Sequence, residues 1–392
     1  MILERNMTPK GHYNIIVVGG GIAGVSAALA AVRAGSSVLL LEKSINLGGL
    51  ATGGLISYYE PLCDGKGKQM IFGIGEELIR LACSCGFNNL GTEWGGHGKG
   101  ARRDGRFASY YSPTVFSLAL DRLVRESGIL LRPDSLAIAP ILEGNRCTGV
   151  AVESANGCEL FGADVVIDAT GDASVFHRAG LPTADGENYL TYIAHAMTKK
   201  GLERYLEDGQ LFRYRQWINV GSNLFGEGQP EGMPPVAGTT TEDIARFIAL
   251  GKDRMLARIE SGEGEIEELM TLPTMPQFRT VRRIVGNTNF CGIDGETFSD
   301  SIGECGDFRP KGVGQHFQIP FGALWNKECV NLLAAGRIIS APQGDGWEIS
   351  RVIPVCALTG EAAGRAAALC ALEGKTLADL DAKDIARIRV TE

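Results

Sequence analysis

Three glycines near the start of the chain have the types and spacing needed to hold a pyrophosphate. Gly19, Gly21 and Gly24 form a G-x-G-x-x-G pattern within VVGGGIAGVSAALA, residues 17–30. In this pattern the first glycine permits a tight turn, the second lets the backbone approach phosphate groups, and the third lets a helix pack closely on a strand. The free N–H groups at the start of that helix would face the anion. Glycine-rich turns are common, so the pattern needs support from its surroundings.

The flanking residues predict the elements that position these glycines. Residues 13–18 (YNIIVV) and 36–42 (SSVLLLE) are short apolar runs that predict strands. Between them Ile22, Val25 and Leu29 recur at helical spacing, which gives a strand-helix-strand unit of the parallel type. Further strands are predicted at 163–169 and 330–335, each followed by a glycine turn, so we expect one sheet built from distant parts of the chain.

An acidic residue ends the second predicted strand. Glu42 follows Gly19 by 23 positions, where a carboxylate accepts hydrogen bonds from ribose hydroxyls. A carboxylate there also disfavours a 2′-phosphate, which makes NADP an unsuitable ligand. The alternative is a plain glycine turn with an exposed glutamate beside it, and the surrounding strand-helix-strand pattern favours the dinucleotide.

Four segments together carry a resemblance to a known family. They are VVGGGIAGVSAALA, LLLEKSINLGGLATGG at 39–54, VVIDATGDA at 165–173, and NLLAAGRIIS with RVIPVCALTGEAAGRAAAL between 331 and 369. In combination they resemble the FAD-dependent oxidoreductase family of the glutathione-reductase-like flavoprotein superfamily. The resemblance covers roughly half of the chain and implies an α/β fold. Its parts would be a Rossmann-like FAD-binding domain with a parallel sheet and a discontinuous α+β cap that carries the substrate side.

The resemblance also implies a set of FAD-binding residues. By position, the glycine turn surrounds the pyrophosphate, the end of the second strand meets the adenosine ribose, and the helix after Pro354 points its N-terminus at the flavin. The positive end of that helix would stabilise negative charge on reduced flavin. The implied residues are Gly19, Gly21, Ile22, Ala23, Gly24, Glu42, Lys43, Gly49, Leu50, Ala51, Thr52, Ala137, Thr170, Gly171, Asp172, Gly336, Arg337, Val352 and Ile353.

Composition predicts how the chain divides. We expect the FAD-binding domain to comprise residues 12–57, 111–185 and 320–375. Residues 58–110 and 186–319, richer in aromatic, acidic and arginine residues, are expected to form the cap, and residues 376–392 a C-terminal tail.

Two departures from the family pattern narrow the chemistry. Disulfide reductases carry a cysteine pair after the Gly-Gly turn, but here the first cysteine after Gly49 is Cys63, so a flavin-disulfide relay is not expected. The nearest second dinucleotide pattern, GHGKGA at 96–101, does not follow an apolar strand and fails the test of context. We therefore expect electrons to come from the substrate itself, or to pass to or from a transient donor, acceptor or partner protein.

The candidate catalytic residues are those that could manage a proton or charge near the flavin. Glu348 and Arg351, next to Trp347 in GDGWEISRVIP, lie between the Gly336 turn and the C-terminal helix, on the expected flavin side. Arg282 in RTVRRIVG is a further candidate, with a strand-edge charge or a salt bridge as the alternative. His97 in a glycine-rich loop is another, with a solvated histidine as the alternative.

Composition excludes several other classes. A net charge of -8 and a pI near 5.4 argue against nucleic acid as a partner. The N-terminus lacks the apolar segment of a signal peptide, no apolar run is expected to approach the ~20 residues of a membrane helix, and a cytoplasmic location follows as the default. The spacing of the histidines predicts no metal site, and the ten cysteines are expected to be free thiols.

The sequence therefore predicts an FAD-dependent oxidoreductase that moves two electrons, as a hydride, between a small organic substrate and flavin N5. A flavin monooxygenase is the alternative within the enzymes. The alternative from another class is a flavoprotein-like fold that binds a nucleotide or a partner without turnover. The substrate, the oligomeric state and any covalent attachment of the flavin are left open.

Overall fold

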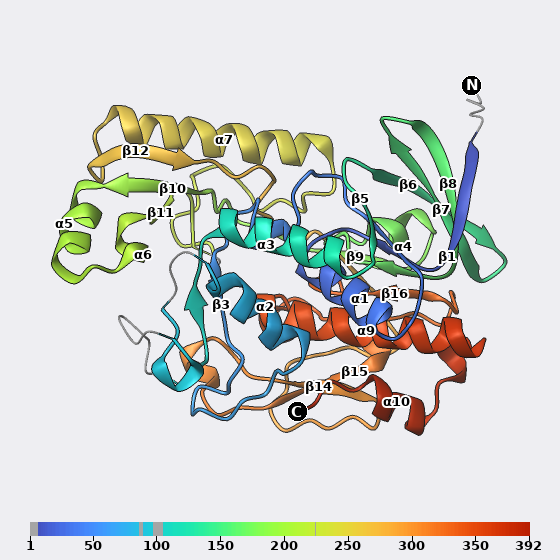
Figure 1. Cartoon of the computed structure of the whole chain (residues 1–392). Coiled ribbons are helices and arrows are strands. Elements are labelled where there is room, and N and C mark those ends of the chain that lie inside the picture. The colour runs from blue at the N-terminus through green and yellow to red at the C-terminus, as the bar shows by residue number, and fades with distance from the viewer. Residues whose placement is uncertain (1–6, 86–88, 97–104, 224) are drawn as a thin grey trace.

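A mixed sheet with helices on its faces forms the body of the molecule (Figure 1). The computed structural model describes residues 7–85, 89–96, 105–223 and 225–392. The strand order is β5-β2-β1-β8-β7-β6, and β16 pairs with the second half of β8. Strands β5, β2, β1, β8 and β16 are parallel, whereas β6, β7 and the first half of β8 form an antiparallel meander. The strands are β1 (Thr8–Val18), β2 (Val38–Leu41), β5 (Leu130–Arg132), β6 (Leu136–Glu143), β7 (Arg146–Ser154), β8 (Gly157–Asp168) and β16 (Leu332–Ala334).

Continuous apolar runs in the parallel strands reflect burial on both faces of the sheet. Ile15 and Val17 of β1 join the apolar cluster on the side of α1 and α9, whereas Ile16 and Val18 join the cluster on the opposite side. Successive side chains of a strand point to opposite faces, so only a strand covered on both sides is apolar at every position. The α/β fold with a parallel, Rossmann-like sheet is thereby confirmed.

Two helices pack on one face of the sheet with their backbones in contact. They are α1 (Ile22–Arg33) and α9 (Ile353–Glu373). A Cβ atom added to Gly360 would lie 2.2 Å from the carbonyl oxygen of Ala23, and one added to Gly364 would lie 2.2 Å from that of Ala27. The two glycines of α9 therefore permit a distance between the helices that no larger residue allows.

The expectation of no apolar run of membrane-spanning length needs correction at α9. This helix is 21 residues long with a mean hydropathy of 1.3 in its most apolar window, enough to cross a membrane by length and composition alone. In the fold, 78% of that window is buried, as in the core helix of a folded domain. Contact with the sheet and with α1 accounts for its many small apolar residues.

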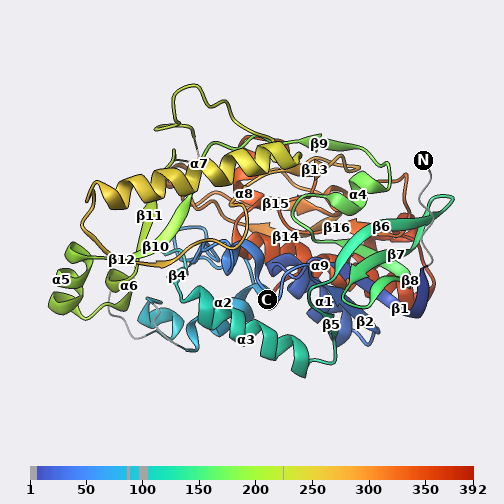
Figure 2. The same cartoon turned by 90° about the horizontal axis from the view of Figure 1, so that it is seen from above.

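The cap has its own sheet and its own apolar core. Tyr192, Phe247 and Phe278 lie in this core, and the long helix α7 covers the cap sheet (Figures 1 and 2). The cap elements are α5 (Lys199–Asp208), α6 (Leu211–Tyr214), α7 (Thr241–Glu260) and the antiparallel strands β10 (Ile193–Thr198), β11 (Gln216–Asn219) and β12 (Ile266–Thr271).

The apolar clusters divide the chain differently from the predicted boundaries. Leu78 and Ile79 from the expected cap segment 58–110, and Ile302 from the segment 186–319, belong to the same cluster as α1 and α9. Residues 376–392, expected as a tail, fold onto that cluster through Ile385 and Ile388. The elements of these three segments are β3 (Tyr58–Tyr59), α2 (Ile74–Cys83), β4 (Ser109–Tyr110), β14 (Ser301–Cys305), β15 (Phe317–Pro320) and α10 (Ala382–Ile388), and α3 (Pro113–Glu126) follows β4.

The remaining elements of the described chain are short. They are α4 (Ser174–Arg178), β9 (Thr183–Asp185), β13 (Arg282–Ile284), α8 (Asp345–Ser350) and the 3₁₀ turns Gly49–Ala51, Thr92–Trp94, Pro310–Gly312, Phe321–Ala323 and Leu377–Asp379.

Candidate functional site

A cavity of about 510 Å³ lies at the carboxyl ends of β1, β2, β8 and β16, where ligands bind in open parallel sheets. The cap closes one side of it with residues 274–276, Phe278 and Val281. Most residues that the sequence placed around a cofactor line this cavity. They are Gly19, Gly21, Ile22, Ala23, Glu42, Lys43, Gly49, Leu50, Ala51, Thr52, Thr170, Gly171, Asp172, Gly336, Arg337 and Ile353.

The glycine turn after β1 has the shape of a cradle for a ligand. Gly19 has a φ of 104°, and a Cβ on Gly24 would lie 1.8 Å from the Gly19 carbonyl oxygen, so Gly24 serves helix packing and does not line the cavity. Gly21 is different, because a Cβ there would meet no atom within 4 Å. The space in front of Gly21 fits the close approach of a pyrophosphate to the backbone.

Glu42 connects the turn after β1 with the segment after β2. Its Oε2 accepts a 2.6 Å hydrogen bond from the N–H of Gly20, and its Oε1 accepts one of 2.7 Å from the N–H of Ser44. The Gly48 N–H donates to the Gly20 carbonyl at 2.8 Å, so the Gly48-Gly49 turn also rests on the glycine turn. A 9% exposed carboxylate is thus fixed at the cavity wall, where it can accept further bonds from a ribose.

Asp168 at the end of β8 orders the turn after that strand, which forms one wall of the cavity. Asp168 was not among the predicted site residues. Its carboxylate accepts hydrogen bonds from the N–H and hydroxyl of Thr170 (3.0 and 2.6 Å) and from the N–H of Val175 (2.9 Å). Burial raises the pKa of Asp168 to about 6. Arg337 completes this wall because its Nε donates a 2.7 Å hydrogen bond to the Gly171 carbonyl. The signal was the aspartate inside VVIDATGDA, two residues before Thr170.

The N-terminus of α9 forms the opposite end of the cavity. Val352 is the N-cap residue, and Ile353 and Cys356 line the cavity from the first turn. Unpaired N–H groups at a helix N-terminus attract negative charge. Burial raises the pKa of the Cys356 thiol to about 11, so the thiol stays protonated at neutral pH. Cys356 was not among the predicted site residues.

Two of the candidate catalytic residues, Glu348 of α8 and its C-cap residue Arg351, form a buried ion pair. Arg351 Nη2 donates a 2.6 Å hydrogen bond to Glu348 Oε2, and the two side chains are 10% and 8% exposed. The Arg351 guanidinium also lies 5.0 Å from the ring centroid of Trp347. Arg351 lines the cofactor cavity, whereas Glu348 and Trp347 line a second cavity of about 390 Å³ next to it.

The remaining candidates lie elsewhere. Arg282 on β13 forms a 3.6 Å ion pair with Asp185 and lines neither cavity. It therefore has the alternative role considered for it, that of a salt bridge. Ala137 on β6 does not line the cofactor cavity, and its carbonyl accepts a 2.6 Å hydrogen bond from Arg178. His97 lies outside the described residues. Within the described ranges, no group of three or more His, Cys, Asp or Glu side chains could hold a metal ion.

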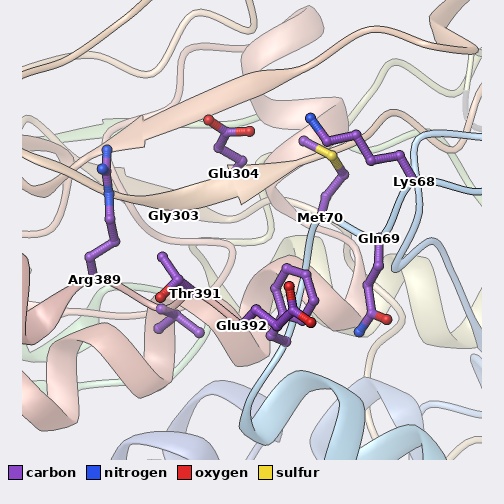
Figure 3. Close-up of a pocket in the computed structure, with 10 residues that line it drawn as sticks. Lys68, Gln69, Met70, Gly303, Glu304, Arg389, Thr391 and Glu392 are labelled. Carbon is purple, nitrogen blue, oxygen red and sulfur yellow. The ribbon is translucent and has the colours of Figure 1, made fainter.

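A further cavity of about 470 Å³ lies between β14 and the C-terminal residues (Figure 3). Figure 3 shows the side chains of Lys68, Glu304, Arg389 and Glu392 around it. Charges of both signs line this cavity, and it shares no lining residue with the cofactor cavity.

Comparison with known proteins assigns the chain to a family. Its sequence matches the FAD dependent oxidoreductase family over residues 14–191 and 243–389, and the unmatched part between them belongs to the cap. It is 26% identical to a digeranylgeranylglycerophospholipid reductase of Methanosphaerula palustris over 306 residues, 76% of this chain and 70% of that protein.

Among solved structures, a geranylgeranyl bacteriochlorophyll reductase-like protein from Thermoplasma acidophilum aligns over 98% of this chain and 83% of its own, with 14% identity and a TM-score of 0.41. A myxobacterial chondrochloren halogenase, described as an FAD-dependent halogenase, aligns over 96% and 78%, with 15% identity and a TM-score of 0.48. The match to the family covers most of the chain. The chain therefore belongs to the FAD dependent oxidoreductase family, and it is an enzyme that uses FAD.

Proposed function

We propose that the 510 Å³ cavity holds the FAD of this enzyme. In this proposal Gly21 faces the pyrophosphate, Glu42 accepts hydrogen bonds from the adenosine ribose, and the first turn of α9 faces the flavin. The observation that carries the proposal is the convergence of these three elements on one cavity, with open space in front of Gly21.

Bound FAD supplies two-electron redox chemistry, and we infer that it exchanges a hydride with a small organic substrate. The role of the protein is to bind FAD, to orient it and to shield it from water. The Arg351 guanidinium and the N-terminus of α9 place positive charge at one end of the cavity, which stabilises negative charge there. Phe278 and Val281 of the cap cover the cavity with apolar groups that exclude water.

A substrate panel tests the proposed reaction. The purified protein is reconstituted with FAD, and its flavin absorbance is followed anaerobically while small metabolites are added one at a time. Bleaching by one compound identifies the reductant, and reoxidation by a second compound identifies the acceptor. If the chain binds no FAD, the assignment of the cavity is wrong. If bleached protein adds oxygen to the substrate on exposure to air, the enzyme is a monooxygenase instead.

A further inference from the structure

Arg279 is a buried cation whose side chain is hydrogen-bonded to no carboxylate in the part of the chain that the structure describes. It is 9% exposed, and its Nη1 donates a 2.6 Å hydrogen bond to the backbone carbonyl of Gln277. Burial lowers the pKa of Arg279 to about 9, the positive charges of Arg351 and Arg337 lower it as well, and the negative charge of Glu348 offsets this in part. The guanidinium is still charged at neutral pH. A buried charge is costly unless an opposite charge accompanies it.

The backbone of Arg279 is held in place by a buried amide. Asn188 Oδ1 accepts hydrogen bonds from the N–H of Arg279 (2.8 Å) and of Thr280 (3.1 Å), and its Nδ2 donates to the carbonyls of Thr280 and Val236. Asn188 is itself 5% exposed. The position of Arg279 is therefore fixed by the fold, unlike that of an arginine on a surface loop.

Arg279 lines the second cavity, where the other cations are already neutralised. Arg309 pairs with Asp307 at 2.8 Å and with Asp345 at 2.7 Å, and Lys311 pairs with Asp345 at 2.8 Å. Among the described cations of this cavity, Arg279 is thus the one without a carboxylate bonded to it.

The acidic residues that line the second cavity make no hydrogen bond to the Arg279 side chain within the described chain. Glu348 is hydrogen-bonded to Arg351 and acts on Arg279 only through its charge, and Glu187 is exposed to solvent. Thr191 and Tyr189 add hydroxyl groups to the lining. Beside the Arg351 end of the cofactor cavity, the second cavity thus offers a ligand one cation without a bonded carboxylate, together with hydroxyl groups.

We propose that the second cavity binds the carboxylate of a small organic substrate and that Arg279 is the residue that pairs with it. A guanidinium presents two parallel N–H donors that match the two oxygens of a carboxylate. The proposal rests on the proposed function only in taking the bound compound as the substrate, because carboxylate binding does not require FAD.

Isothermal titration calorimetry of the whole chain with and without FAD tests this, with succinate, benzoate and acetate at constant ionic strength and inorganic phosphate as the comparison anion. We expect saturable binding of at least one carboxylate, weakened tenfold or more in Arg279→Gln and partly retained in Arg279→Lys. The matched control is Arg283→Gln, because Arg283 is a half-buried arginine whose pKa burial lowers as well, yet it lines none of the three cavities described above.

The outcomes separate the two proposals. The inference is overturned if no carboxylate binds the wild type, if phosphate alone binds, or if Arg279→Gln binds carboxylate like the wild type. It is also overturned if Arg279→Gln loses FAD while carboxylate binding persists. Carboxylate binding through Arg279 in a chain that takes up no FAD would support this inference and refute the proposed function. Melting temperatures add a structural check, since removing a buried charge to which no carboxylate is bonded should leave Arg279→Gln as stable as the wild type.

Discussion

The carboxylate of Glu42 accepts a hydrogen bond from the N–H of Gly20, so the residue that ends β2 is attached to the turn that ends β1. Glu42 and Gly20 are 22 positions apart in the chain, and the bond between them is 2.6 Å long. It fixes the carboxylate at the wall of the cofactor cavity before any ligand is present. The same side chain therefore shapes the glycine turn and offers its remaining lone pairs to a ribose.

We expect Glu42→Gln to weaken FAD binding by about 10- to 100-fold, the usual loss for one or two hydrogen bonds to a charged group. The amide keeps the size of the side chain but removes the charge and one acceptor. Quenching of flavin fluorescence measures the dissociation constant. Glu143→Gln, an exposed position at the end of β6, is the matched control and should bind FAD like the wild type. Equal affinity of the two variants would contradict the role of Glu42.

The packing of α1 on α9 predicts a steric effect. Gly360→Ala places a Cβ 2.2 Å from the carbonyl oxygen of Ala23, so a helix must move. We expect the free energy of unfolding to fall by about 1–3 kcal/mol, as for overpacked cores. Urea denaturation measures it, with the exposed Leu372→Ala on the same helix as the control, expected to change stability by less than about 0.5 kcal/mol. A neutral Gly360→Ala would mean that the two helices are further apart.

Neutralising Arg351 and neutralising Glu348 should shift the flavin reduction potential in opposite directions. Removing the positive charge in Arg351→Gln should lower the potential, whereas Glu348→Gln leaves Arg351 without its counter-charge and should raise it. We expect shifts on the order of tens of millivolts, since 30 mV corresponds to about 1.4 kcal/mol for two electrons. Equilibration with a redox dye measures both, and Arg365→Gln further along α9 is the control. Shifts of the same sign in both variants would refute a direct electrostatic role.

Burial of the His195 imidazole should make the stability of the protein depend on pH. It is 1% exposed, and burial first, then the charge of Arg215, lowers its pKa to about 3. Below pH 6.5 the unfolded chain binds a proton at this position that the folded chain cannot, so stability falls as pH decreases from 6.5 toward 3. The contribution approaches about 1.4 kcal/mol per pH unit below pH 5.5.

His195→Gln should remove this dependence, and the difference in unfolding free energy between wild type and variant should grow in favour of the variant from pH 7 to pH 5. Urea denaturation at each pH gives that difference. The exposed His177→Gln serves as the control and should follow the wild type at every pH. Parallel curves for the wild type and His195→Gln would mean that the His195 ring can take up a proton in the folded state.

Local patterns allowed much of the fold and cofactor cavity to be anticipated. The glycine turn and Glu42 are close in sequence to the strands that place them, so periodicity and spacing were enough. Arg279 could not be found in this way, because its surroundings come from Asn188 and from residues beyond position 300. Arg282, three residues later, was a candidate catalytic residue because of its charge. The pairing of β13 with β9 places it beside Asp185 instead.

The division into domains was less accessible to sequence reasoning for a similar reason. Residues 58–83 have a mixed composition, but Leu62 and Leu78 belong to the core around α9, more than 270 positions away. Composition reports what a segment contains and not which surface it covers. Likewise α9 has the hydropathy of a membrane helix because the fold surrounds it with apolar side chains.

The most direct measurement of the central claim is the FAD content of Gly21→Ala and Gly21→Val. Gly21 has a φ of -66°, which alanine adopts without strain, and its added Cβ would meet no protein atom within 4 Å. Gly21→Ala should therefore unfold at the same urea concentration as the wild type while binding FAD at least tenfold more weakly, and Gly21→Val more weakly still. Stoichiometric FAD with unchanged affinity in both variants would contradict the assignment of this cavity to the cofactor.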